Sequence, residues 1–511
     1  MLKPIRPLFR TPTLNRMTPS QAMRSVTSKS GLGVYASSDN LFKGAVFGRD
    51  SLEVAEDLMP IRGKLVEKIL LTLASLQGEV NNADNEEEPG KIIHEYRTSR
   101  IDGKPIDENS SKILRRLSER WGGTSTQLAY YGSVDATPLF IRAVHWYTTL
   151  YGDSIMNRRI QLRSGHVLPF SAVVDNAVGW VIHKVESSKS GLIEYQRVNP
   201  KGIENQVWKD STEFYVHTNG EVANHKKPIS SIEVQAIAYD ALRGAAKLLP
   251  GREAQANAIA AQLRTRALEL LWVPQIDYFA LGTDYDEAGN LRLIETVTAN
   301  PAELLDSTFF DDLPADQTER YIGGITRRIM GTEFLTDAGI RSRSLYEANL
   351  VSFWDYHGSY TSWPKETYDI AKGLKRQGLP KLAHELENRL LNVVKSMKSF
   401  PEFVYVDYRG RVLGMPNKRE THGELLFVDS SNKPEKVQAW TVSAVVAINS
   451  AKRSRFGGSK HSSWQHKLEK EVLAHIPHVP ILKTSKELAA RYPAYPYELA
   501  DNQMVHGGKP E

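Results

Sequence analysis

Apolar residues recur three and four positions apart in several long segments, and this period restricts the fold more than any other feature of the chain. In "FSAVVDNAVGWVIHKVESS", residues 170–188, they form one stripe along a predicted helix. "IRGKLVEKILLTLASLQ" and "AQANAIAAQLRTRALELLW" show the same spacing. Strand-like alternation is confined to short stretches at 278–296 and 403–413, which predict hairpins. We therefore predict an all-α protein with small β-hairpin insertions.

The predicted helices come in pairs. The first helices start near Ser51, Thr137, Ser231, Pro301, Pro364 and Pro434, and the second helices cover 61–78, 170–188, 253–272, 316–330, 380–398 and 463–474. Proline suits such starts because its missing N–H would be unpaired in a first helical turn. Six helical hairpins in series can close into an (α/α)6 barrel with the first helices inside. An open solenoid is the alternative, but the chain shows no sequence repeat.

These patterns predict three regions: a basic, disordered leader over 1–34, a barrel over 35–480 and a C-terminal extension over 481–511. No apolar run approaches the ~18 residues that a membrane-spanning helix needs. The chain has no cysteine, which excludes disulfides and thiolate chemistry and fits a reducing compartment, so we expect a cytoplasmic protein. Its 65 basic and 60 acidic residues are mixed, so we expect no nucleic-acid partner. Nothing in the sequence implies an oligomeric state.

Polar and aromatic residues gather just ahead of the predicted first helices, in "FGRDS", "YYGSVDATP", "NQVWKDS", "DYHGSYTSWP" and "FPEF". In a closed barrel these helix ends face one cavity. Aromatic faces, carboxylates and planar amide or guanidinium groups match the needs of a sugar ring. Two carboxylates in such a cavity could be the acid and base of glycoside cleavage. No histidine pair has the spacing of a zinc site, so we expect no metal and no other cofactor.

The order of eight motifs resembles that of a known enzyme family. "FGRDS", "PGKIIHEYR", "YYGSVDATPLFI", "VWKDS", "KPISSIEVQAIAYDAL", "DYHGSYTSWP", "SFPEF" and "VQAWTVSAVV", within about 35–455, are similar to the glycogen-debranching amylo-α-1,6-glucosidase family. They also resemble related α/α-barrel glucosidases, including glucosylglycerate and mannosylglycerate hydrolases. The resemblance implies an α-glucosidase in which Asp210, of the "W-x-D" motif, is the general acid and Glu402 the general base. Glu435, just after Pro434, is the rival base.

The motifs and the resemblance together nominate further residues for substrate binding. They are Arg49, Asp50, His94, Glu95, Arg97, Tyr131, Asp135, Trp208, Lys209, Glu233, Gln235, His357, Trp363, Gln438 and Trp440. Some have simpler interpretations, since Arg49 and Asp50 could be an ion pair that caps a helix. Lys209 would lower the pKa of Asp210, which is wrong for an acid, unless the two side chains face opposite ways.

We therefore expect an inverting glycoside hydrolase that cleaves an α-glucosidic bond in a glucan branch or a small α-glucoside. The aglycone, and the choice between glucose and mannose, stay open. The alternatives are a non-catalytic carbohydrate-binding barrel and a sugar lyase or epimerase, which would need a Tyr or His base. Because Asp210 and Glu402 lie on separate loops, we expect a carboxyl separation of about 6.5–9.5 Å, which leaves room for the attacking water.

Overall fold

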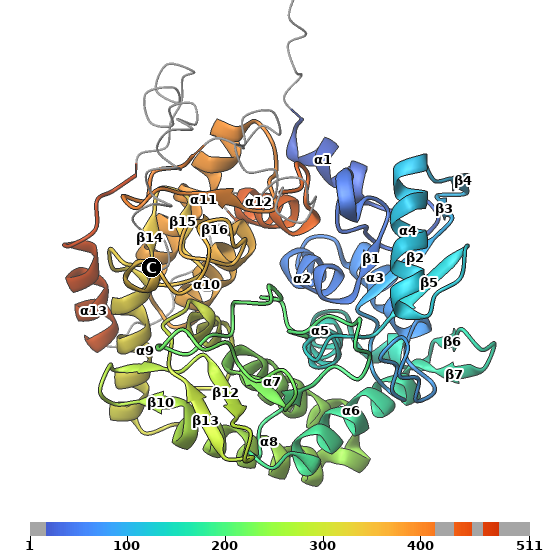
Figure 1. Ribbon diagram of the computed structural model, residues 1–511, viewed down its shortest axis with the longest axis horizontal. Helices are drawn as coiled ribbons and strands as arrows, with labels where there is room; N and C mark the ends of the chain where they lie inside the picture. Colours follow the sequence, from blue (N-terminus) through green and yellow to red (C-terminus); the bar gives the residue numbers. More distant parts are fainter. Residues whose placement is uncertain (1–16, 414–433, 452–462, 480–511) are drawn as a thin grey trace, which may run out of the picture.

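The computed structural model describes residues 17–413, 434–451 and 463–479, and helices dominate this part of the chain (Figure 1). The first helices of the predicted pairs are α2 (Gly48–Leu58), α5 (Ala136–Tyr151), α7 (Ile232–Leu248), η4 (Asn300–Asp306), α10 (Pro364–Arg376) and α12 (Ala439–Ala451). The second helices are α3 (Gly63–Ser75), α6 (Phe170–Ser187), α8 (Glu253–Leu271), α9 (Ala315–Ile329), α11 (Pro380–Met397) and α13 (Ser463–Leu473). The predicted helix positions are therefore confirmed, except that the fourth first helix is a short 3-10 helix and the sixth begins at Ala439, five residues after Pro434.

The first helices form a ring. In order, α2 packs on α5, α5 on α7, α7 on η4, η4 on α10, α10 on α12, and α12 again on α2. The helices α3, α6, α8, α9 and α11 each pack outside the first helix that precedes them. Every residue of α2 is buried, whereas α3 buries only one face. The difference follows from position, because an inner helix has neighbours on all sides.

The sixth pair departs from the prediction. Helix α13 packs against α9 and α11, and the helix that packs against α12 is α1 (Pro19–Val26). The predicted disordered leader over 1–34 is therefore wrong from residue 17 onward. Thr18 and Gln21 form a capping box at the start of α1, and Ala22, Met23 and Val26 are fully buried. Residues 1–16 and the predicted extension over 481–511 lie outside the described residues.

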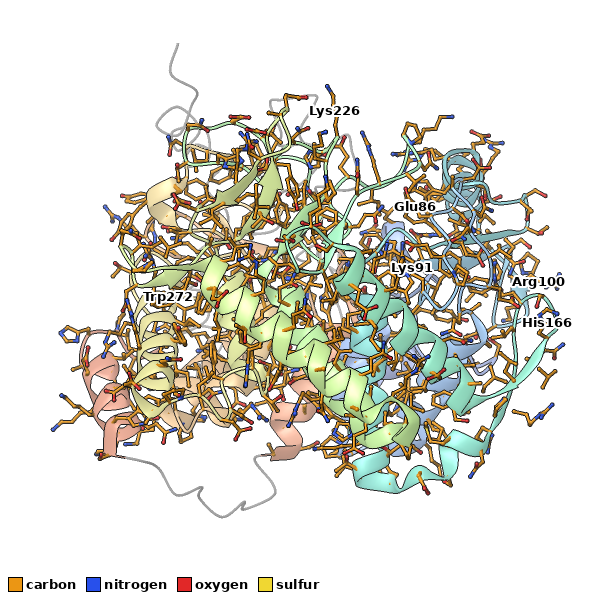
Figure 2. All side chains as sticks on the ribbon, turned by 90° about the horizontal axis from the view of Figure 1, so that it is seen from below. Glu86, Lys91, Arg100, His166, Lys226 and Trp272 are labelled. Carbon is orange, nitrogen blue, oxygen red and sulfur yellow. The ribbon has the colours of Figure 1, made fainter. Side chains whose placement is uncertain are left out.

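Short strands and turns lie at one end of the ring. One sheet contains β1 (Val46–Phe47), β2 (Glu95–Thr98) and β5 (Gln127–Tyr130), and another contains β8 (Glu194–Tyr195), β9 (Ile229–Ser231), β12 (Gly282–Tyr285) and β13 (Leu291–Ile294). The strands β12 and β13 are the hairpin predicted at 278–296. At 403–413, Val406 bridges to Val412, while β17 (Val404–Tyr405) pairs with β16 (Thr361–Ser362). In the side view of Figure 2, Lys226 marks the end of the molecule where these loops gather.

The remaining elements are small, apart from α4 (Glu108–Trp121), which the sequence analysis missed. Two-stranded pairs are formed by β3 (Arg100–Ile101) and β4 (Lys104–Pro105), β6 (Arg159–Gln161) and β7 (Val167–Pro169), β10 (Trp272–Val273) and β11 (Tyr278–Phe279), and β14 (Leu335–Thr336) and β15 (Gly339–Ile340). Short 3-10 turns are η1 (Asn40–Phe42), η2 (Asp153–Asn157), η3 (Pro250–Arg252) and η5 (Leu345–Glu347). Among the described residues, no helix is long and apolar enough to cross a membrane.

Candidate active site

A cavity of about 410 Å³, here called the site cavity, lies among the segments that lead into the first helices. Most of the predicted site residues line it: Arg49, Asp50, His94, Glu95, Arg97, Trp208, Asp210, His357, Trp363, Glu402 and Trp440. These residues come from loops, from strand β2 and from the first turns of α2 and α12, which are far apart in the sequence. The ring brings them together because the loops precede helices that share one orientation.

Asp210 lies in the irregular segment between β8 and β9. The Tyr356 hydroxyl donates a hydrogen bond to Asp210 Oδ1 (2.9 Å), and His357 Nε2 lies 3.5 Å from the same oxygen. Burial raises the pKa of Asp210, but these two contacts and the charge of Arg49 together hold it below its usual value. Burial also lowers the pKa of His357 to about 4. Asp210 is therefore ionised, and His357 neutral, at pH 7.

Lys209 does not share the environment of Asp210. Its side chain is fully buried and forms an ion pair with Glu366. The ammonium lies 5.0 Å from the centre of the Trp208 ring, and the two form a cation–π interaction. Lys209 is not a cavity-lining residue, so the two neighbours do face opposite ways, and Lys209 supports Trp208 from behind.

Glu402 lies in the turn between α11 and β17, and its carboxylate Oε2 accepts the backbone N–H of Glu435 (3.0 Å). Burial raises the pKa of Glu402 well above its usual value, and the nearby carboxyl groups of Glu435, Asp50 and Asp210 raise it further. Of the two candidate carboxyl groups, Glu402 therefore favours the protonated form and Asp210 the ionised form.

Glu435 has a different task. Its carboxylate accepts hydrogen bonds from the Ser37 hydroxyl (2.9 Å) and the Leu41 N–H (2.9 Å), and it is not among the residues that line the site cavity. It therefore ties the segment around Leu41, which forms part of the cavity wall, to the start of the last inner helix. The geometry favours Glu402 over Glu435 as a carboxylate that can reach a substrate.

Arg49 and Asp50 begin α2, and they do not form the helix-capping ion pair that was the alternative to a role in substrate binding. The N-cap is Phe47, and Arg49 instead holds Asp135 through Nε (2.7 Å to Oδ2) and Nη2 (3.1 Å to Oδ1). Gln438 Nε2 donates to Asp50 Oδ1 (2.9 Å). Burial raises the pKa of Asp50 to about 7, and Arg49 opposes this rise. Asp135 and Gln438 thus fix the two residues that face the cavity.

Aromatic rings form one wall of the cavity. His357 stacks on Trp363 with ring centres 4.7 Å apart and planes 15° apart. The edges of Trp208 and Trp440 meet Trp363, with centres at 5.5 and 5.9 Å. The indole N–H groups of Trp208 and Trp363 are bound behind the wall, by Glu303 Oε1 (2.8 Å) and the Tyr356 carbonyl (2.6 Å). The wall can cover the apolar face of a sugar ring.

Two buried imidazole nitrogens at the cavity have no hydrogen-bond partner in the described part of the chain: Nδ1 of His94 and Nδ1 of His357. Burial lowers the pKa of His94 to about 3, so this ring is also neutral at pH 7. Next to it, Glu95 and Arg97 form an ion pair, and Arg97 Nη2 donates to the Leu41 carbonyl (2.8 Å). The pair stiffens this side of the cavity.

Six of the residues nominated from sequence do not line the cavity: Tyr131, Asp135, Lys209, Glu233, Gln235 and Gln438. Each has a polar group that is already engaged. The Tyr131 hydroxyl donates to the Leu76 carbonyl (2.8 Å), Gln235 Nε2 donates to the Ile193 carbonyl (3.0 Å), and Glu233 accepts from the Ser231 hydroxyl. These side chains are engaged away from the cavity, so their nomination as direct sugar ligands is corrected.

The structure adds residues that the sequence analysis missed. Helix α4 brings Arg116, Leu117, Arg120 and Trp121 to the cavity, and Tyr356 joins it through its bond to Asp210. The signals for α4 were present, because Asp107 caps its first turn and Gly122 ends it with a positive φ of 67°. Among the described residues, no group of three or more His, Asp or Glu side chains is placed to hold a metal ion.

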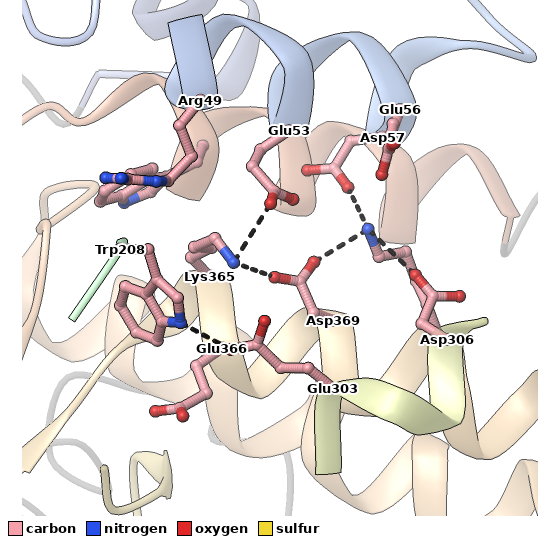
Figure 3. Close-up of polar contacts among 12 residues, drawn as sticks. Arg49, Glu53, Glu56, Asp57, Trp208, Glu303, Asp306, Lys365, Glu366 and Asp369 are labelled. Carbon is pink, nitrogen blue, oxygen red and sulfur yellow. Dashed lines mark hydrogen bonds and ion pairs between the residues drawn. The ribbon is translucent and has the colours of Figure 1, made fainter. Parts of the chain in front are cut away.

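Behind the aromatic wall, the inner helices carry a second set of charges, here called the charged network (Figure 3). Lys365 Nζ lies 3.3 Å from Glu53 and 2.7 Å from Asp369. Lys372 Nζ contacts Asp369 (2.9 Å), Asp57 (3.1 Å) and Asp306 (3.7 Å). The bond from Trp208 Nε1 to Glu303 connects this network to the cavity wall.

Comparison with known proteins gives similarity in fold alone. No family model and no curated protein sequence matches the chain. A solved GH63 mannosylglycerate hydrolase from Thermus thermophilus in complex with glucose is similar, with a TM-score of 0.51, 12% identity, and coverage of 84% of this chain and 99% of that one. The same hydrolase in complex with Tris, and an uncharacterized conserved protein from that organism, each have a TM-score of 0.52 at 12% identity, with the same coverage.

At 12% identity these similarities concern the fold and not the family. They support a helical fold of the kind found in glycosidases. They do not support the glycogen-debranching family in particular.

Proposed function

We propose that the protein is an inverting glycoside hydrolase on an (α/α)6 barrel, and that it cleaves an α-glycosidic bond with Asp210 as general acid and Glu402 as general base. One observation carries the proposal: two carboxyl groups from separate loops line a single cavity whose wall is built from Trp208, Trp363 and Trp440. The closed ring of first helices with second helices outside supports the barrel. Similarity to a solved mannosylglycerate hydrolase supports the hydrolase class.

The surroundings suit an inverting reaction. Such a reaction needs one protonated and one ionised carboxyl group, and the surroundings raise the pKa of Glu402 while they lower the pKa of Asp210. Arg49 and Asp50 can bind vicinal hydroxyls of the sugar, and the free Nδ1 atoms of His94 and His357 can accept or donate one further bond each. Water then attacks the face of the sugar opposite the leaving oxygen, and the first product has the inverted anomeric configuration.

One observation favours the reverse assignment of the two roles. The pKa of Glu402 is raised and the pKa of Asp210 is lowered, so Glu402 would be the acid unless substrate binding reverses this order. A substrate with a fluoride leaving group separates the two assignments, because fluoride departs without general-acid help. With α-glycosyl fluoride, Asp210→Asn should retain turnover and Glu402→Gln should lose it. The opposite result would exchange the two roles and keep the hydrolase.

Charge at the exposed side of the cavity points to an anionic aglycone. Arg116 and Arg120 of α4 and Arg197 line the cavity there, and of these only Arg197 forms an ion pair within the described residues, with Glu204 (2.7 Å). We infer a small α-glycoside whose aglycone carries a carboxylate, as in the mannosylglycerate that the similar solved enzyme is named for. Guanidinium groups bind carboxylates in a bidentate manner, which suits this task.

A glucan branch is the second candidate substrate, and a neighbouring cavity favours it. This open cavity of about 770 Å³ shares Arg197 and Glu204 with the site cavity, and Lys226, marked in Figure 2, lines it. It could hold further sugar units. However, no aromatic side chain of the described residues lines it apart from the imidazole of His225, so it lacks the stacking surface that a glucan would use.

The test is a panel of glucosylglycerate, mannosylglycerate, isomaltose and a branched dextrin, scored for released sugar and, by proton NMR in the first minutes, for its anomer. We expect fastest release from a glycerate glycoside, with inversion. Calorimetric binding without turnover would indicate a non-catalytic barrel. An unsaturated or epimerised product would indicate a lyase or epimerase. First release of the retained anomer would overturn the proposed mechanism.

A further inference from the structure

A separate cavity of about 450 Å³, here called the basic groove, lies between the end of α1 and the start of α3. It is lined by Arg24, Thr27, Ser28, Lys29, Arg62, Lys64, Leu65 and Lys68. Five of these eight side chains are cationic, and none is acidic or aromatic. The groove shares no lining residue with the site cavity. Its composition is therefore unlike that of the carbohydrate pocket, and it suits an anion.

The cations of the groove are not paired with a carboxylate in the described part of the chain. None of the five side chains forms an ion pair or a hydrogen bond there. Two acids lie close by but form no ion pair with these cations: Asp102 accepts the Ser28 hydroxyl (3.0 Å) and the backbone N–H of Lys29 (2.8 Å) at the edge of the groove, and Glu67 faces Arg158 (3.7 Å). This contrasts with the charged network, where each lysine contacts at least two carboxylates.

The positions of these cations are unfavourable for α3 itself. Arg62 is the N-cap of α3 and makes no side-chain capping bond, and Lys64 lies in the first turn, which contains no acid. The N-terminus of a helix carries partial positive charge, so cations there are destabilising. Lys64 and Lys68 are four residues apart on the helix, a spacing at which like charges repel. A bound anion would relieve all three conflicts at once.

We propose that the basic groove binds an anion that carries clustered phosphate groups. Lysine ammonium groups act as point charges for phosphate, and arginine provides a planar pair of donors. The partial positive charge at the start of α3 also favours an anion there, although the N–H groups of Leu65 and Val66 already donate to the Arg62 carbonyl. Such a ligand is either a free oligophosphate or the headgroup of an anionic lipid. The chemistry of recognition is the same for both.

The experiment titrates tripolyphosphate into the full chain by calorimetry and compares two double variants. Lys64→Gln with Lys68→Gln removes two groove charges. Lys467→Gln with Lys470→Gln removes the same formal charge from exposed positions on α13, and serves as the matched control. We expect the wild type and the control to bind alike, and the groove variant to bind at least about tenfold more weakly. Without anion, the groove variant should melt no earlier than the wild type, because charge repulsion is relieved.

A second arm identifies the source of the phosphate, by sedimentation with phosphatidylcholine vesicles that contain or lack phosphatidic acid. If the protein binds tripolyphosphate but not the vesicles that contain phosphatidic acid, the ligand is a soluble oligophosphate. If it binds these vesicles, the ligand is a lipid headgroup. If neither binds, or if the groove variant and the control behave alike in both arms, the proposal is overturned. Preferential binding of an oligonucleotide that tripolyphosphate cannot displace would overturn it in favour of nucleic acid. Glycoside hydrolysis should be unchanged in the groove variant, so this test is independent of the proposed activity.

Discussion

Two sets of carboxyl groups, buried or partly buried, lie on either side of the aromatic wall, and they differ in how their charge is compensated. In the charged network, Lys365 and Lys372 bridge the acids of α2, η4 and α10. In the site cavity, neither Asp210 nor Glu402 contacts a lysine or an arginine in the described residues; their partners are a tyrosine, a neutral histidine and a backbone N–H. The ion pairs of the charged network hold the ring of inner helices together. The carboxyl groups of the site cavity are not held by a cation, so they can exchange a proton with a substrate or water.

The comparison predicts that changes in the cavity affect turnover and changes in the network affect stability. The largest effect is expected from Asp210→Asn and Glu402→Gln. Each keeps the shape of the side chain but cannot exchange a proton, so turnover of an unactivated α-glycoside should fall about 10²–10⁴-fold. Glu435→Gln is the matched control, since its amide oxygen can still accept the N–H of Leu41. Steady-state kinetics measures turnover, and thermal melting measures stability.

The role of Asp210 would be rejected if Asp210→Asn retained more than about a tenth of the wild-type rate on that substrate. A Glu435→Gln variant less active than Glu402→Gln would move the base to Glu435. A large loss of melting temperature in either cavity variant would show that the cavity carboxyl groups are structural, and the contrast with the network would disappear.

In the network, Lys372→Met should destabilise the fold without removing a catalytic group. It leaves Asp57, Asp306 and Asp369 without their shared cation, and breaking a buried ion pair typically costs about 3–5 kcal/mol. Lys112→Met breaks an exposed pair with Glu108 on α4 and should cost only about 0.5 kcal/mol. Denaturant unfolding measures the difference. Equal free energies of unfolding for the two variants would contradict a structural role for the network.

The contrast between network and cavity also shows what the sequence could and could not predict. The helix positions follow from apolar period, and the cavity residues follow from the order of motifs ahead of the inner helices. However, Glu53 and Asp57 occupy helix positions that their charge alone would predict to be solvent-exposed. Their partners Lys365 and Lys372 lie about 300 residues away in the chain, so only the closed ring shows that these charges are internal.

The same limit explains the errors at the site. Asp135 and Gln438 carry the residue types of sugar ligands, but packing across the ring commits them to Arg49 and Asp50. Arg116 was missed for the opposite reason. It belongs to a helix outside the six predicted pairs, and nothing in its local sequence indicates that α4 covers the cavity.

The pH dependence of stability gives a smaller effect. Burial raises the pKa of Glu303 to about 8, although Lys365 opposes the rise, and burial raises the pKa of Asp306 to about 6. A carboxyl group whose pKa is raised on folding binds more protons in the folded state. Its contribution is complete below the unfolded pKa and is lost as the pH rises through the folded value. Stability should therefore fall between about pH 5 and pH 8.

Glu303→Gln tests this assignment, because the amide oxygen can still accept the Trp208 N–H but the group no longer titrates. The free energy of unfolding of this variant should change less between pH 5 and pH 8 than that of the wild type, by on the order of 1–2 kcal/mol. Glu253→Gln, at an exposed position at the start of α8, should follow the wild type. If the free energy of unfolding depends on pH in the same way in all three proteins, groups other than Glu303 cause the pH dependence.

The smallest effect concerns the rim of the cavity, where charge serves recognition and not stability. Arg116 lines the cavity and Arg115, its neighbour on the exposed side of α4, does not. Arg116→Gln should raise KM for a glycoside with a carboxylate aglycone about tenfold while kcat changes little, because the interaction is made equally in the bound substrate and the transition state. A glycoside with a neutral aglycone should show no change, and Arg115→Gln should match the wild type on both substrates. If KM rises equally for the two arginine variants on both substrates, the effect comes from general charge attraction and not from a contact in the cavity. The proposal of an anionic aglycone then loses its support.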